Sequence, residues 1–238
     1  TGSSVTQGRL ITSTIAAILM LSSVILIGYL GQLSLANLTF AGVAAYLSSR
    51  LAADGSIYGF SAFALDGPGF PSPLAMILGV LIAVAVGILI AIPAVRIRGL
   101  QLAVVTLAAA VAITEMIMGN ESLIGKGARS NLSVPPPRWF GADITVDPSI
   151  SRDRPALIIF CCIWLLLSIV AVVGIRKGVT GRKFLAVRAN EKAASSVGIN
   201  VASAKLLGFG IGSGLAGIAG VLTAYQQTVL QISTWDAL

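Results

Sequence analysis

The sequence predicts an all-α membrane protein, a polytopic bundle of transmembrane helices, and three observations support this prediction. The chain of 238 residues is 56% hydrophobic and 11% charged, with a mean hydropathy of +0.93, whereas soluble domains carry about 25% charged residues. Its apolar residues also form several stretches of about 20 residues, enough for a helix to cross the hydrocarbon core of a bilayer. The excess of basic residues is concentrated between two such stretches, which is typical of membrane topology rather than of nucleic-acid binding.

Six segments are predicted to span or enter the membrane. Their approximate bounds are 10–29, 33–53, 73–95, 99–118, 156–175 and 205–226. The second segment follows the first after only Leu30-Gly31-Gln32, and it carries Asn37 and Thr39. We therefore expect it to be broken or re-entrant, which is tolerated where protein or a water-filled cavity shields the backbone.

The basic residues of the connections predict the orientation of these segments. The stretch 176–205 holds seven basic residues, Lys205 included, against the single acid Glu191, so we expect it in the cytoplasm. By parity Arg96 and Arg98 lie on the same side, whereas the connection 119–155, with five basic residues and four acids, lies outside. Both termini then lie outside, which predicts that the chain is a fragment and that at least one helix precedes it.

Small residues recur at every fourth position in the third and last segments. These sets are Gly79, Ala83, Gly87 and Ala91, then Gly208, Gly212, Ala216 and Gly220, with Gly210 and Gly214 on an adjacent stripe. Four-residue spacing puts each set on one helix face, where neighbouring backbones can approach closely. Two interpretations stay open, namely tight helix packing and a face that slides or lines a path.

The cytoplasmic connection contains a short predicted helix of about two turns. Asn190 suits the N-cap, Glu191 suits the first turn because of the helix dipole, and Gly198 can adopt the left-handed conformation that ends a helix. A short rigid helix between two membrane segments can transmit motion from a soluble partner into the membrane by rigid-body displacement.

The sequence contains no pattern typical of catalysis or metal binding. It lacks histidine, its acids are scattered, and it has no G-x-x-x-x-G-K-[ST] loop for nucleotide phosphates. Cys161 and Cys162 are adjacent in an apolar segment, so we interpret them as packing residues rather than as a disulfide or a metal site. We expect this chain to be neither an enzyme nor a metalloprotein.

Three stretches of the sequence resemble one family of transporters. Glu191-Lys192-Ala193-Ala194, followed by Gly198, is similar to the E-A-A…G coupling loop of ATP-binding-cassette importer permeases, with Lys192 in place of the first alanine. The surrounding residues 181–207 resemble the permeases of branched-chain amino acid and related amide importers, as do residues 28–46 and 93–108.

The resemblance implies the permease subunit of an importer for branched-chain amino acids or similar small solutes, multi-pass in a bacterial inner membrane. It implies one transmembrane permease domain over 1–238, with 119–155 as an external loop and 176–204 as a cytoplasmic coupling loop. The implied partners are membrane lipid, a second permease subunit, two cytoplasmic ATP-binding subunits and an external solute-binding protein, and no nucleic acid. ATP and Mg would be bound by the partner subunits, so this chain would hold no cofactor.

Two sets of residues are predicted to carry this function. The residues expected to couple the chain to the ATPase are Gly181, Arg182, Arg188, Glu191, Ala193, Ala194, Gly198 and Asn200. The polar residues expected along the substrate pathway are Gln32, Ser34, Asn37, Thr39, Thr106 and Glu115. Polar side chains of this kind can offer hydrogen bonds to the ammonium and carboxylate of an amino acid, although Glu115 also suits an interfacial position.

The sequence also differs from the family and leaves other functions open. The family commonly has Gly-His where this chain has Ala36-Asn37, and often an acid at the position of Val111, one turn before Glu115. A permease for urea and short amides, or for a monosaccharide, would share the helices and the coupling loop, but the sugar branch lacks the 31–34 stretch. A membrane enzyme would require a nucleophile, acid or metal site, and an ungated channel or scaffold would leave the short cytoplasmic helix unexplained.

Overall fold

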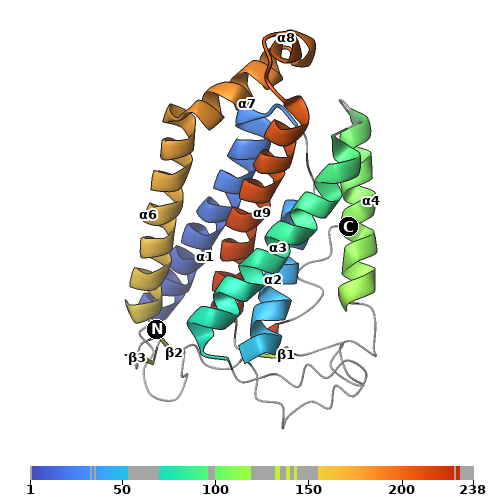
Figure 1. Ribbon diagram of the computed structural model, residues 1–238. Coiled ribbons are helices and arrows are strands. Elements are labelled where there is room, and N and C mark those ends of the chain that lie inside the picture. The colour runs from blue at the N-terminus through green and yellow to red at the C-terminus, as the bar shows by residue number, and fades with distance from the viewer. Residues whose placement is uncertain are drawn as a thin grey trace.

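Long helices lie side by side in the computed structural model of the chain (Figure 1). The structure describes residues 2–32, 34, 36–52, 70–95, 100–118, 132–134, 138–139, 142–143, 155–227 and 229–230. The helices are α1 (Gly2–Ser23), the π-helix η1 (Val24–Tyr29), α2 (Asn37–Ala52), α3 (Ser72–Ala94), α4 (Leu100–Met118), α6 (Pro155–Lys177), α7 (Val179–Ala189), α8 (Glu191–Ser196) and α9 (Val201–Gln226).

The helical bundle predicted from the sequence is confirmed. Four helices are long and apolar enough to cross a membrane, over Thr6–Tyr29, Ser72–Pro93, Ala156–Lys177 and Val201–Gln226. Gln101–Met116 forms a shorter apolar helix, and α2, with 16 residues, is also shorter than a full span. The bounds of the six predicted segments agree with the helices to within a few residues, except that α1 and α9 begin earlier than expected.

The second predicted segment is helical only from Asn37, and α2 then runs without interruption to Ala52. The first segment continues through η1 to Tyr29, but α2 begins only at Asn37. The Asn37 amide donates a hydrogen bond to Ser23 Oγ, 2.9 Å away, so α2 begins level with the end of α1 rather than with the end of η1. Figure 1 shows α2 starting part of the way along the bundle. The chain therefore turns back beside η1 in a non-helical conformation before α2 starts.

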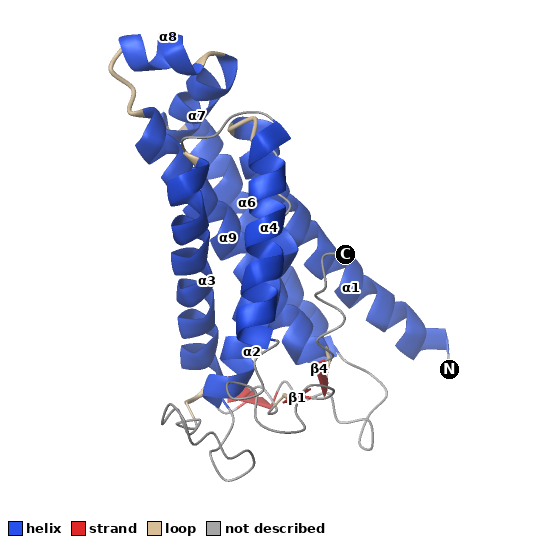
Figure 2. Ribbon diagram, turned by 90° about the vertical axis from the view of Figure 1, so that its right-hand side faces the viewer, coloured by secondary structure: helices blue, strands red, loops and turns tan. Residues whose placement is uncertain are grey.

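Two short strand pairs were not predicted from the sequence. β1 (Leu132–Ser133) pairs antiparallel with β4 (Val229–Leu230), and β2 (Arg138–Trp139) pairs antiparallel with β3 (Ala142–Asp143). They lie at the end of the bundle opposite α7 and α8 (Figures 1 and 2). The described part of the predicted external loop and the predicted cytoplasmic connection thus lie at opposite ends, as the parity argument requires. Arg96 and Arg98 lie outside the described residues.

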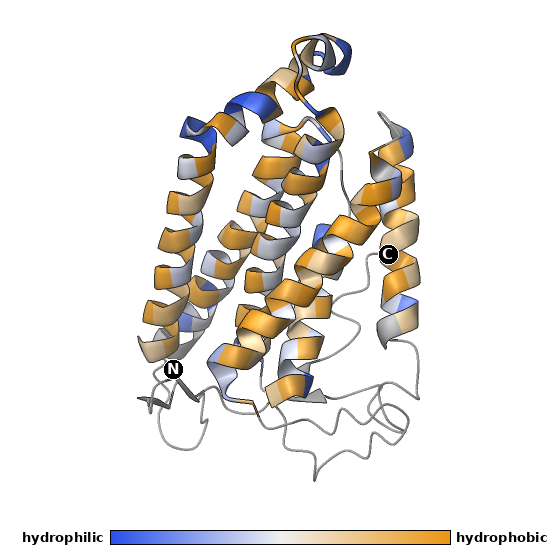
Figure 3. Cartoon of the chain, viewed as in Figure 1, coloured by the Kyte–Doolittle hydropathy of each residue, from blue (hydrophilic) through white to orange (hydrophobic). Residues whose placement is uncertain are grey.

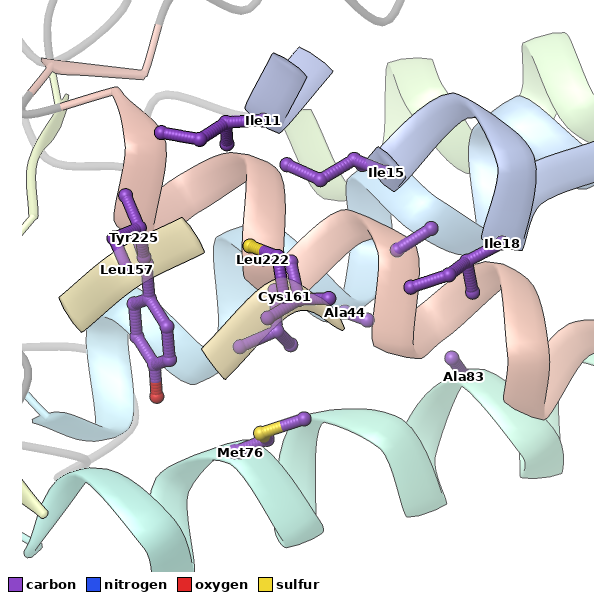
Figure 4. Close-up of a cluster of buried hydrophobic side chains, with 12 residues drawn as sticks. Ile11, Ile15, Ile18, Ala44, Met76, Ala83, Leu157, Cys161, Leu222 and Tyr225 are labelled. Carbon is purple, nitrogen blue, oxygen red and sulfur yellow. The ribbon is translucent and has the colours of Figure 1, made fainter. Parts of the chain in front are cut away.

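The hydropathy of the helices fits this arrangement. Apolar residues cover most of the long helices, whereas hydrophilic residues gather on α7 and α8 at one end (Figure 3). Inside the bundle, one cluster of buried side chains joins α1, α3, α6 and α9 (Figure 4). Cys161 packs in this cluster, as predicted, while Cys162 is exposed on the neighbouring face of α6.

The small residues of α3 and α9 serve close helix packing. A Cβ atom on Gly79 would lie 2.9 Å from the Ala44 carbonyl oxygen of α2. A Cβ on Gly87 would overlap Ser213 of α9, and one on Gly220 would overlap the backbone of Ala41 in α2. Of the two interpretations of the small-residue faces, the structure supports tight packing, because these glycines already touch a neighbouring helix.

Candidate functional site

Helix α7 was not predicted from the sequence, and it lies across the end of the bundle that carries the predicted cytoplasmic connection (Figure 1). A single residue, Gly178, separates α7 from α6, so the chain turns sharply there. Gly181 is buried in this corner, where a Cβ atom would come within 2.7 Å of the Arg176 carbonyl oxygen. Phe184 and Val187, three residues apart, are the buried face of α7. That i, i+3 pair was the signal available in the sequence, hidden among basic residues.

Helix α8 forms where the sequence predicted a short helix. Asn190 Oδ1 accepts hydrogen bonds from the backbone N–H groups of Lys192 (3.0 Å) and Ala193 (3.2 Å), so Asn190 is the N-cap. Gly198 adopts φ +85° after the last turn, and the Ile199 N–H donates to the Ala194 carbonyl oxygen at 3.0 Å. The predicted cap and stop are both confirmed, and α8 has six residues.

Asn200 connects α8 to the last membrane helix. Its Oδ1 accepts a hydrogen bond from the Ser203 N–H at 3.0 Å, which makes Asn200 the N-cap of α9. Only residues 197–200 separate the two helices. Two capped helix starts and a short connection hold α8 at the beginning of α9.

Glu191 contacts a buried lysine of the same chain. Lys205 is completely buried in the second turn of α9, and its Nζ lies 2.9 Å from Glu191 Oε1. The Glu191 side chain retains 22% of its exposure. Sequence analysis placed Glu191 in the coupling loop but did not single out Lys205, which had counted only toward the basic charge. The signal for Lys205 was a single cation within an otherwise apolar stretch.

Arg188 joins α7 to the end of the first membrane segment. Its guanidinium donates a hydrogen bond to the Gly28 carbonyl oxygen in η1. Its aliphatic stem packs beside Gly31, where an added Cβ would lie 2.8 Å from Arg188 Cγ. Gly31 also has φ +67°, a conformation that favours glycine. Glycine is therefore required at position 31 both for the turn after η1 and for the close approach of the Arg188 side chain.

The eight predicted coupling residues therefore fall into two groups. Arg182, Ala193 and Gly198 are exposed, together with Val197, which sequence analysis missed and which is 80% exposed at the tip of α8. The other five make contacts within the chain that hold α7, α8 and α9 in place. They are Gly181, Arg188, Glu191, Ala194 and Asn200.

Four of the predicted pathway residues come together at the break before α2. Gln32, Ser34, Asn37 and Thr39 are all buried. The Ser34 hydroxyl accepts a hydrogen bond from the Ala36 N–H at 3.4 Å. In contrast, the side-chain oxygens of Gln32, Asn37 and Thr39 have no hydrogen-bond partner among the described residues. Buried polar atoms are normally paired, so these three acceptor oxygens are unusual.

The last two predicted pathway residues lie on α4 and differ from each other. Thr106 is fully buried and donates to its own helix at the Ala103 carbonyl oxygen, 3.0 Å away. It lies one turn before Ala110, which packs against Ala36 and Phe40 at the start of α2, so Thr106 is on the face of α4 that points toward the break. Glu115 is exposed on another part of α4, so the structure does not bring it to the other five.

The described residues offer little for metal chemistry. No group of three or more His, Cys, Asp or Glu side chains that could hold a metal ion occurs among them. What they provide instead is a polar break inside an apolar bundle and a capped helix pair at one end of it. Together these features define the class of the protein as a multi-pass helical membrane protein with the design of a transport permease.

Comparison with known proteins identifies the family within that class. Residues 6–237 match the family described as the permease component of branched-chain amino acid transport systems, and the chain belongs to this family. This is a family of transport permeases and not a family of enzymes. With its apolar helices, the family membership indicates a multi-pass protein of the bacterial inner membrane.

Two curated relatives share significant similarity with the chain. It is 28% identical over 166 residues to the high-affinity branched-chain amino acid transport system permease protein LivM of Salmonella typhimurium, and 29% identical over 166 residues to LivM of Escherichia coli. Each alignment covers 62% of this chain and 38% of the relative, so the matched part is well under half the length of these relatives. No solved structure was found to match the chain.

Proposed function

We propose that the chain is part of the permease subunit of an ATP-binding-cassette importer for branched-chain amino acids or chemically similar small solutes. The single observation that carries this proposal is the capped helix α8, held at the cytoplasmic end of the bundle in a chain of this family. In this proposal ATP and Mg are bound by two partner ATPases, and a second permease subunit and an external solute-binding protein complete the importer. The chain itself performs no chemistry on the solute.

The exposed face of α8 is suited to docking on an ATPase. Ala193, Ser196 and Val197 are exposed at the tip, and their side chains are small enough to enter a groove on a partner. Arg182, near the start of α7, adds an exposed positive charge at the same end of the bundle. Apolar contacts at the centre with charged residues at the rim are the usual arrangement of a protein interface.

The polar break before α2 is suited to a solute that donates hydrogen bonds. Gln32 Oε1, Asn37 Oδ1 and Thr39 Oγ1 are acceptors, and each lacks a partner among the described residues. An ammonium group supplies three N–H donors, and a bond to a charged group contributes about 1.5–3 kcal/mol. The acceptors favour the ammonium of an amino acid, although the N–H groups of urea or a short amide offer the same kind of donor.

The mechanism has to connect α8, at one end of the bundle, with the polar break before α2. The ATPases close on binding ATP and displace α8, and the bundle then changes between outward-open and inward-open states as helices move as rigid bodies. Irregular backbone at the break lets α2 and η1 shift relative to each other without distorting a continuous helix.

The proposal is tested by ATP-dependent uptake in vesicles that contain the full-length subunit and its partner subunits. We expect uptake of labelled leucine, and Val197→Asp should weaken ATPase binding by about 100-fold, because an unpaired carboxylate in an interface costs roughly 3 kcal/mol. Val179→Asp is the matched control, because Val179 is also exposed but lies in the first turn of α7, where an acid is favourable.

The outcomes of this experiment discriminate among the candidate functions. Uptake of urea or ribose in place of leucine would keep the coupling mechanism and replace the substrate. Uptake that does not depend on ATP, or that is the same in Val197→Asp and Val179→Asp, would contradict the importer mechanism.

A second prediction concerns the acceptor oxygens at the break. Asn37→Leu and Thr39→Val each remove one acceptor, and we expect each to raise the solute concentration for half-maximal uptake by roughly tenfold. Thr114→Val is the matched control, because the Thr114 hydroxyl donates to the Ala110 carbonyl oxygen of its own helix. Equal uptake in all three variants, with the complex assembled, would remove Asn37 and Thr39 from the pathway.

A further inference from the structure

Lys205 is an unusual residue for the inside of a membrane helix. It is among the largest fully buried side chains of the described residues, within a helix whose other buried residues are mostly small or apolar. A cation in such a place is costly unless it is paired. Its ion pair in the structure is with Glu191, whose Oε1 lies 2.9 Å from Nζ, and the angles at this contact fall outside those of a hydrogen bond.

Glu191 is oriented toward this lysine by the local fold of the chain. Asn190 caps α8 and fixes Glu191 as its first residue, while Asn200 caps α9 five residues before Lys205. Ala194, one turn after Glu191, is buried in the same cluster as Ala204, next to Lys205 in sequence. Polar and apolar contacts thus join the same face of α8 to the same turn of α9.

The contacts of α9 with the other helices show which parts of the bundle would move with it. Along its length α9 packs against α1, α2 and α3, and its Gly220 lies against the backbone of Ala41, one turn after Asn37. A displacement of α9 is therefore passed directly to α2, the helix that begins at the polar break.

We infer that the Lys205–Glu191 pair is a strut that makes α8 and α9 move as one body, so that force applied to α8 reaches the polar break through α9. This inference rests on the proposed function and changes the role of one residue in it. The resemblance assigns Glu191 to ATPase docking, whereas in this structure its carboxylate is already paired inside the chain. Glu191 and Lys205 are positioning residues, and docking belongs to the exposed face around Val197.

Charge exchange in the full-length transporter, assembled with its ATP-binding subunits in vesicles, tests the strut. We expect Glu191→Lys and Lys205→Met each to lower the amount of solute carried per ATP hydrolysed by roughly tenfold, while the ATP-binding subunits stay bound. The double variant Glu191→Lys with Lys205→Glu should recover most of that loss, because it restores one opposite pair. Lys183→Glu is the matched control, since Lys183 is an exposed cation on α7 rather than on α8 and its reversal should change the ratio little.

A second measurement on the purified full-length subunit needs neither ATP nor solute. Loss of the strut in Lys205→Met should speed amide hydrogen exchange in α8 by about tenfold relative to Lys183→Glu. Unchanged exchange in Lys205→Met would overturn the strut even if the transported solute is never identified. The strut would also be overturned if the double variant transports as poorly as the single ones and has lost its ATP-binding subunits, because Glu191 would then act on the partner.

Discussion

The two long helices on either side of α7 and α8, namely α6 and α9, are similar in length and opposite in environment. The most apolar 18 residues of α6 have a mean hydropathy of 3.1, and 22% of them are buried. In α9 the corresponding mean hydropathy is 1.7, and 67% of the residues are buried. In a soluble protein the more apolar helix would be the more buried one. Here the order is reversed. Lipid is as apolar as leucine, so burying a large apolar side chain inside the bundle brings no hydrophobic gain.

The residues of the two helices show what burial selects instead. On α6 large apolar side chains such as Ile159, Leu166 and Val170 are more than half exposed. On α9 the buried positions are rich in glycine, alanine and serine, which allow the backbones of α2 and α3 to approach. The comparison teaches that α9 is held by close backbone contact, and α6 mainly by its place in lipid.

The largest expected difference is between glycine substitutions on the two helices. Gly220→Ala should destabilise the protein by at least about 2 kcal/mol, because the new Cβ meets the Ala41 backbone, which no side-chain rotation can relieve. Gly174→Ala on α6 is the matched change, with no atom within 4 Å of the new Cβ, and should be neutral or stabilising by about 0.5–1 kcal/mol. Thermal unfolding of the full-length subunit in detergent measures both.

Equal losses of stability in the two variants would contradict the comparison. Gly212→Ala provides an intermediate case, because its new Cβ would meet Leu26 Cδ1 at 3.0 Å, and that flexible side chain can move. We expect its stability to fall between those of the other two.

The sequence predicted the features that depend on neighbouring residues. Asn190 and Gly198 set the start and end of α8 through bonds to residues within a few positions, so their types alone were informative. That the second segment is broken or re-entrant stays a prediction, because α2 itself is one uninterrupted helix and its polar residues lie at its start. The family resemblance depended on the same local patterns and is confirmed by the family match.

What the sequence did not predict depends on contacts between distant residues. Arg188 looked like one more cytoplasmic cation, yet it bonds to Gly28, 160 residues earlier in the chain. Glu191 was interpreted as a docking residue from its motif. Its pairing with Lys205 could not be read from the sequence, since it depends on α8 folding back onto α9. α7 was missed because its two large buried residues, Phe184 and Val187, are surrounded by charge, which favoured a loop. None of these outcomes can be predicted from charge and periodicity along the chain alone.

The smallest expected difference is between two buried serines, one reaching α9 and one on α6. Ser22 of α1 donates to the Gly212 carbonyl oxygen of α9 at 2.8 Å, whereas Ser168 of α6 donates to the Trp164 carbonyl oxygen of its own helix at 2.8 Å. A hydrogen bond between membrane helices contributes about 0.6 kcal/mol, so Ser22→Ala should lower the free energy of unfolding by about that amount. Ser168→Ala should leave it unchanged, because its bond is present whether or not α6 packs on the bundle. Denaturant titration of the two variants side by side measures this difference, and a larger loss for Ser168→Ala would mean that α6 depends on specific contacts as much as α9 does.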